Sequence, residues 1–124
     1  DNLQIQQHIE ILLADGTTRL KAAITAQSAE RLELDEGKEV LVLLKAPWVS
    51  ITRDPDAAKT ADNQLQGTIS HIERGQTQCE VQMTLADGQP LCATIPLSES
   101  DNVEEGAAVT AYFNADRVII ATLC

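Results

Sequence analysis

The residues of this sequence that could do chemistry are two hydroxyl side chains and one lysine. Thr25 and Ser28 stand where a short helix is expected to begin, so their hydroxyls can cap its first turn. The amide hydrogens of that turn have no partner inside a helix, and they favour a bound anion. Lys45 ends the apolar run that follows, and its ammonium could reach the same space. This pattern is typical of an anion site, although a capped helix followed by a strand-end lysine would need no ligand.

Strands must position these residues on both sides of the helix. Residues 19–25 read as a strand that returns from a tight turn at Asp15-Gly16, since Asp-Gly accepts the positive backbone angles of a hairpin. Before this turn, apolar residues alternate with polar ones, which predicts a half-buried strand. After the helix, residues 40–44 are almost continuously apolar, which predicts a strand covered on both faces. Residues 49–52 read as a further short strand.

Composition excludes several functions. The chain has 124 residues, and 9 basic against 19 acidic side chains give a formal net charge of −10. This charge repels nucleic-acid phosphates and removes the counterion release that drives their binding. No apolar run approaches the length of about 20 residues that a membrane helix needs. The sequence therefore predicts that this segment binds neither DNA nor a membrane.

Cysteines and histidines indicate no metal centre. Cys79, Cys92 and Cys124 are odd in number and far apart, so neither a zinc site nor a disulfide framework is expected, and unpaired thiols are typical of a reducing cytoplasm. Cys92 is expected near the core. His8 and His71 lie on expected strands without a paired carboxylate or cysteine at the spacing of metal ligands, so they are expected at the surface and not in a metal site. No general base or nucleophile stands out, and an enzyme is the least supported class.

The second half of the sequence repeats the first. Residues 13–16 (LADG) recur as 85–88, and the offset between matching residues falls from 72 to 71 to 69 along the chain. Residues 53–62 carry charge, proline and small side chains without an apolar period, and they read as a linker. We therefore expect two similar β-rich units, 1–52 and 63–124.

The repeat also indicates that the first unit lacks one strand. In the second unit, residues 63–72 form an alternating strand ahead of the strand expected over residues 79–85. Subtraction of the offset of 72 places the matching strand of the first unit before Asp1. We expect residues upstream in the intact protein to supply this strand, because an unpaired sheet edge would otherwise remain.

A family signature runs through the centre of the first unit. The residues ITAQSAERLELDEGKEV at 24–40, LKA at 44–46 and the following Val49 resemble the Mop, or molbindin, domain. The tandem arrangement, the segment 46–49 (APWV) and the ending 112–124 are similar to the effector region of molybdate-responsive transcription regulators. This resemblance covers essentially the whole chain.

The resemblance implies a fold and a ligand. The fold would be all-β, with two tandem OB-like five-stranded Greek-key barrels, each with one short helix, and with the first barrel lacking its opening strand. The ligand would be molybdate or tungstate, bound as the oxyanion in the cytoplasm where two subunits of a homodimer meet. The matching ligand positions are Thr25 and Ser28 by their hydroxyls or amides, Lys45 by its ammonium and Ala46 by its backbone amide.

The second unit departs from the family pattern. Asp62 stands where the first unit of family members has an arginine, Pro96 replaces the helix-start threonine, and Asn114 replaces the lysine. An anion there would meet a carboxylate and would lose one donor and one cation. We therefore expect the oxyanion at the first unit, with the second unit as a structural partner.

Several classes of function follow from the resemblance. The favoured one is an oxyanion-sensing domain that controls an upstream DNA-binding domain, which requires the ligand to bind two arrangements of the dimer unequally. A molybdate storage or buffering protein, or the accessory domain of a molybdate transporter ATPase, would use the same unit. An OB-type nucleic-acid module is disfavoured by the acidity and by an aromatic content of only 2%.

Overall fold

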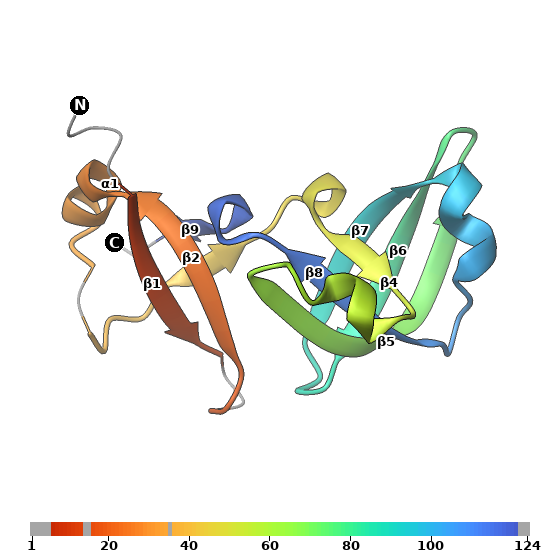
Figure 1. Ribbon diagram of the computed structural model, residues 1–124, viewed down its shortest axis with the longest axis horizontal. Coiled ribbons are helices and arrows are strands. Elements are labelled where there is room, and N and C mark those ends of the chain that lie inside the picture. The colour runs from red at the N-terminus through yellow and green to blue at the C-terminus, as the bar shows by residue number, and fades with distance from the viewer. Residues whose placement is uncertain (1–5, 14–15, 35, 122–124) are drawn as a thin grey trace. The chain divides into compact units, whose positions relative to one another are not determined.

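The computed structural model describes residues 6–13, 16–34 and 36–121, and the chain divides into two compact units (Figure 1). Unit 1 contains the chain up to Leu44 together with the segment from Asn114 onwards, and unit 2 contains Lys45–Phe113. Both units are built from strands with a few short helices, as predicted. Within the described ranges, every helix is too short or too polar to cross a bilayer.

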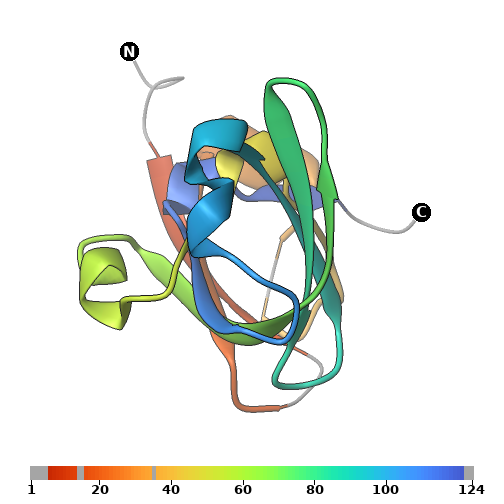
Figure 2. The same ribbon diagram turned by 90° about the vertical axis from the view of Figure 1, so that its right-hand side faces the viewer.

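Unit 2 is a five-stranded antiparallel sheet in the order β4-β8-β5-β6-β7. Figure 2 shows its long green strand, β5, curving through the unit. Strand β6 alternates strictly between exposed and buried residues, so one face of the sheet forms the core. The strands are β4 (Ser50–Thr52), β5 (Asn63–Arg74), β6 (Gln78–Leu85), β7 (Pro90–Pro96) and β8 (Ala108–Phe113).

Strand β5 joins the two halves of this sheet. Residues 63–68 pair with β8 and residues 67–74 pair with β6, with a bulge between Ile69 and His71. A Cβ atom added at Gly67 would lie 2.6 Å from the carbonyl oxygen of Thr84 and 2.8 Å from Cε of Met83. Glycine is therefore required where β5 crosses from one neighbour to the other.

Unit 1 contains two separate two-stranded sheets, β1-β2 and β3-β9. The predicted hairpin of β1 and β2 is confirmed, since the two strands pair antiparallel and Gly16 has a φ of 76°, while Asp15 of the predicted turn lies outside the described residues. The elements are β1 (Gln6–Leu12), β2 (Arg19–Thr25), α1 (Ala26–Arg31), β3 (Leu41–Leu43), η5 (Ala115–Arg117) and β9 (Ile119–Ala121).

The two repeats exchange their last strands. Strand β4 belongs to the first half of the sequence, yet it pairs with β8 of unit 2. Strand β9 belongs to the second half, yet it pairs with β3 of unit 1. The division into units 1–52 and 63–124 therefore stays a prediction. The compact units of the structure divide the chain after Leu44 and after Phe113. The segment 53–62 carries a 3-10 helix, η3 (Pro55–Ala58), whose Ala58 is buried.

Two expectations about burial are wrong. Residues 40–44 were expected to be covered on both faces, but Leu41 is 48% exposed and Leu43 is 53% exposed. The exposure of these two leucines shows that no other described residue covers the outer face of β3. Cys92 was expected near the core, but it is exposed, because it alternates along β7 with the buried Ala93.

Candidate functional site

Helix α1 begins with a pair of hydrogen-bonded hydroxyls. Thr25 ends β2 with extended backbone and is the N-cap of α1. Its Oγ1 accepts a hydrogen bond from the Ser28 amide at 3.1 Å and donates one to Ser28 Oγ at 2.9 Å. Both side chains are half-buried. Because the Thr25 hydroxyl is used in both directions, the hydrogen of the Ser28 hydroxyl is the one that this pair can donate to a ligand.

The far end of α1 is fixed by a lysine. The Leu34 amide donates to the carbonyl of Ala29 at 3.1 Å while Glu33 has a left-handed backbone with a φ of 53°. Lys38 Nζ then donates to the carbonyl oxygens of Leu32 at 2.7 Å and Glu33 at 3.3 Å. A cation at this end also complements the helix dipole. These bonds hold the short helix, and with it the hydroxyl pair, in place.

Lys45 and Ala46 start the 3-10 helix η2 (Ala46–Trp48) in unit 2. The Lys45 ammonium lies 4.8 Å from the centroid of the Trp48 ring, which is cation–π distance. Lys45 is exposed and takes part in none of the ion pairs found among the described residues. The structure thus pairs the hydroxyls of Thr25 and Ser28 in one unit and the lysine with a tryptophan in the other.

The second repeat lacks these donors at the matching positions. Pro96 is the N-cap of η4 (Leu97–Asn102) and provides no side-chain cap. Asn114 stands in the place of Lys45 as the N-cap of η5. The offset of 71 places Glu99 at the position of Ser28, so a carboxylate replaces a hydroxyl. Glu99 could have been recognised from the repeat in the sequence, because the same offset places it opposite Ser28.

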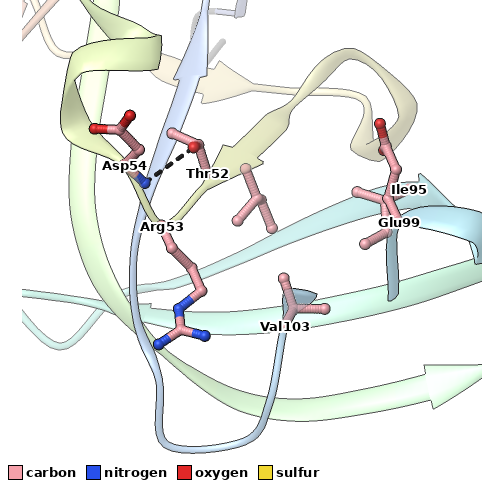
Figure 3. Close-up of a pocket in the computed structure, with 7 residues that line it drawn as sticks. Thr52, Arg53, Asp54, Ile95, Glu99 and Val103 are labelled. Carbon is pink, nitrogen blue, oxygen red and sulfur yellow. Dashed lines mark hydrogen bonds between the residues drawn. The ribbon is translucent and has the colours of Figure 1, made fainter. Parts of the chain in front are cut away.

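A pocket of about 450 Å³ in unit 2 contains this glutamate (Figure 3). Figure 3 shows Arg53 and Asp54 pointing in opposite directions, and the Asp54 amide donates to Thr52 Oγ1 at 3.1 Å. One guanidinium and two carboxylates give this pocket a net negative lining, which is unsuited to a dianion. Its lining residues are Ile51, Thr52, Arg53, Asp54, Ile95, Glu99 and Val103.

His71 is exposed, as predicted, and it has two carboxylate partners. Its Nε2 lies 2.7 Å from Glu73 Oε2, and its Nδ1 lies 3.4 Å from Glu105 Oε1. The hydrogen bond to Glu73 is the main cause that raises the pKa of His71 above 6.5. The two carboxylates occupy different ring nitrogens and do not converge on one point. In the residues that the structure describes, no group of three or more histidine, cysteine or acidic side chains is arranged to hold a metal.

Proteins named as transcription regulators or as molybdenum-pterin-binding match all or nearly all of the chain. The chain is 68% identical over 124 residues to the DNA-binding transcriptional dual regulator ModE of Escherichia coli (strain K12), covering 100% of this chain and 47% of that protein. It is 58% identical over 126 positions to the transcriptional regulator ModE of Yersinia pestis, covering 100% of this chain and 48% of that protein. It is 31% identical over 120 residues to the molybdenum-pterin-binding protein MopA of Rhodobacter capsulatus, covering 94% of this chain and 45% of that protein. The chain spans about half the length of these curated relatives.

Solved structures and a family model agree with these matches. A crystal structure of the cytoplasmic molybdate-binding protein ModG, with molybdate bound, superposes with a TM-score of 0.91 at 32% identity, over 96% of this chain and 86% of that one. MopII from Clostridium pasteurianum superposes with a TM-score of 0.50 at 31% identity, over 51% of this chain and 97% of that one. These neighbours confirm the predicted fold class and the likeness to Mop domains. Since the TOBE domain model matches residues 2–51 and 59–120, this chain belongs to the TOBE domain family.

Proposed function

We propose that this chain is the effector domain of a molybdate-responsive transcription regulator, and that it binds molybdate or tungstate as the oxyanion. The hydroxyl pair at the start of α1 is the observation that carries the proposal. It leaves the Ser28 hydrogen available to an acceptor, whereas the second repeat has Pro96 and Glu99 at the same two positions. The regulators named ModE and the molybdate-bound ModG support the choice of ligand.

The ligand chemistry agrees with these donors. Molybdate is a compact tetrahedral dianion whose four oxygens accept hydrogen bonds. A selective site therefore needs several hydrogen-bond donors that approach the ion from different sides. The Ser28 hydroxyl, the first-turn amides of α1, the Lys45 ammonium and the Ala46 amide are such donors. We propose that they meet around the ion in the ligand-bound homodimer. A smaller anion such as sulfate would leave some of them unpaired, which disfavours it.

Three leucines of unit 1 are exposed, and this exposure supports the homodimer. Leu12 is 56% exposed, Leu41 is 48% exposed and Leu43 is 53% exposed. The matching residues of the second repeat are Thr84, Thr110 and Tyr112, all of which carry a hydroxyl. Exposed leucines on one repeat alone are typical of a surface that a second subunit covers.

The rest of the proposal concerns the longer protein. The matched regulators are about twice as long as this chain, and the chain aligns with the C-terminal part of ModE from Escherichia coli. We propose that an upstream domain binds DNA in the cytoplasm and that the effector domain itself neither binds DNA nor catalyses a reaction. The net charge of −10 supports the lack of direct DNA binding.

Calorimetric titration of the chain with molybdate, tungstate, sulfate and phosphate tests this function. Molybdate and tungstate are expected to bind at least ~10-fold more tightly than sulfate or phosphate. Lys45→Ala is expected to weaken the binding of molybdate about 10- to 100-fold, since hydrogen bonds to charged groups contribute about 1.5–3 kcal/mol. Asn114→Ala is the matched control in the second repeat and is expected to leave affinity unchanged. Equal affinity for sulfate, or equal effects of the two substitutions, would contradict the proposal.

A further inference from the structure

We infer that the pocket of unit 2 binds a small linear molecule with a carboxylate at one end, an ammonium at the other and a short alkyl chain between them. The pocket lies where the two edges of the curled sheet face each other, because the edge strands β4 and β7 both line it. Its volume of about 450 Å³ is that of an ordinary small-molecule site. Its described lining includes none of the residues proposed to hold the oxyanion.

The floor of the pocket is apolar. Ile95 of β7 is 6% exposed and Val103 is 5% exposed, and the half-buried Ile51 of β4 lines the same pocket. An alkyl chain that displaces water from these side chains gains free energy through the hydrophobic effect. A small inorganic ion would gain nothing from this floor. The floor therefore favours a ligand with an aliphatic body.

Two side chains of opposite charge lie at the two sides of this floor. Figure 3 shows Arg53 and Glu99 on opposite sides of the pocket, with Val103 between them. Both are exposed, and neither takes part in the ion pairs found among the described residues. A guanidinium donates hydrogen bonds to a carboxylate, and a carboxylate accepts them from an ammonium. A ligand that reaches both side chains must therefore carry a carboxylate and an ammonium at its two ends.

The second carboxylate of the lining is used elsewhere. Asp54 Oδ1 accepts a hydrogen bond from the Asp56 amide at 3.0 Å and so caps η3, and its side chain points away from Arg53 (Figure 3). Thr52 Oγ1 accepts a hydrogen bond from the Asp54 amide at 3.1 Å. The hydrogen of the Thr52 hydroxyl can then be donated to a ligand carboxylate beside Arg53. These contacts leave one anion-binding end and one cation-binding end.

The matching positions of unit 1 keep the apolar floor but not the charged ends. Arg53 corresponds to Thr122 and Glu99 corresponds to Ser28, and neither counterpart is charged. The two repeats thus differ at both ends of the pocket and agree between them, which indicates a ligand specific to unit 2. The floor residues Ile51, Ile95 and Val103 correspond to Ile120, Ile24 and Leu34.

Titration of the full chain with linear amino acids, without molybdate, tests the site by heteronuclear NMR. Amide signals of residues 51–54 and 95–103 are expected to shift with ε-aminocaproate and to reach saturation. A dissociation constant on the order of 1 mM is expected, because both charged side chains are exposed. Hexanoate and hexylamine have the same alkyl chain with one charged end each. They are expected to bind at least ~10-fold more weakly.

Substitutions at the two ends give the second arm of the test. Arg53→Gln and Glu99→Gln are each expected to weaken the binding of ε-aminocaproate at least ~10-fold. Arg74→Gln and Glu80→Gln remove the same charges from exposed positions outside the described lining, and as matched controls they are expected to leave the affinity unchanged.

Three results would overturn the inference. One is binding of hexanoate or hexylamine as tight as that of ε-aminocaproate, and another is equal weakening by the controls. The third is the absence of saturable shifts at the pocket, as expected if Arg53 and Glu99 pair with each other in solution. Because no oxyanion is added, each of these results leaves the proposed binding of molybdate untouched.

Discussion

Thr25 and Ser28 are adjacent in space, yet their substitution is expected to have different effects. Thr25 caps α1, so Thr25→Val is expected to lower the free energy of unfolding by about 1 kcal/mol and to weaken molybdate binding. Ser28→Ala removes the outward donor and is expected to weaken binding with little loss of stability. Urea denaturation and calorimetry measure the two effects separately. Thr25→Ser keeps the cap and serves as the control. A Ser28→Ala variant that binds molybdate with the parental affinity would contradict the proposal that the Ser28 hydroxyl donates to the ligand.

His71 makes a pH-dependent contribution to stability. Its pKa is raised above 6.5, first by the hydrogen bond to Glu73, against an opposing effect of burial, and then by the charges of Glu73 and Glu105. Because the folded pKa exceeds the unfolded one, this contribution is complete below pH 6.5 and is lost as pH rises through the folded pKa. An NMR titration of the His71 ring is expected to show a midpoint above 6.5 that falls in Glu73→Gln. A midpoint that Glu73→Gln leaves unchanged would show that the contact is absent in solution.

Local chemistry explains which residues could be recognised from sequence. The Thr25 cap acts within three residues, so its pattern is visible in the sequence, and the structure confirms it. The site positions Thr25, Ser28, Lys45 and Ala46 stay a prediction as ligands. His71 meets Glu105 through tertiary structure, which no local pattern indicates. Its other partner, Glu73, lies on the same face of β5 and could have been noticed from the alternation of a strand.

The residue that follows the C-cap of helix α1 has a strained backbone. Glu33 has a φ of 53° in the αL position that follows the helix, where glycine is usual. Glu33→Gly is therefore expected to raise the free energy of unfolding by roughly 0.5–1 kcal/mol. Lys38→Met is expected to lower it, because the carbonyl oxygens of Leu32 and Glu33 lose their donor. Urea denaturation measures whether each substitution raises or lowers the free energy of unfolding. A lower value for Glu33→Gly would contradict this account of the helix end.

The strands themselves could be placed from sequence because alternation and turn residues are local. The hairpin pairing on either side of each Asp-Gly sequence and the strand at residues 19–25 agree with the structure. The exchange of β4 and β9 could not be inferred, because residues 50–52 and 119–121 occupy equivalent places in the two repeats and either could close either sheet. The exposure of β3 was missed for a related reason, since an apolar run is compatible with cover from the same chain or from another one.

The assembly of the whole molecule gives a further prediction. The double substitution Leu41→Thr and Leu43→Tyr introduces the residues that the second repeat has at these positions. It is expected to convert the proposed dimer to a monomer at micromolar concentration, because the subunit interface would lose its exposed leucines. Sedimentation equilibrium measures the change, with Gln82→Thr on an exposed face of unit 2 as the control. An unchanged dimer would place the interface elsewhere on the chain.

The exchange of last strands has a consequence for how such a duplication can evolve. Strand β4 completes the sheet of unit 2, and β9 pairs with β3 of unit 1, so each half of the gene encodes a piece of the other half's sheet. A deletion that removed either half would take away a strand that the survivor needs. The survivor would have to obtain that strand from a neighbouring molecule. Selection therefore acts on the two halves as one heritable unit, even though the residues at their matching helix starts have already diverged.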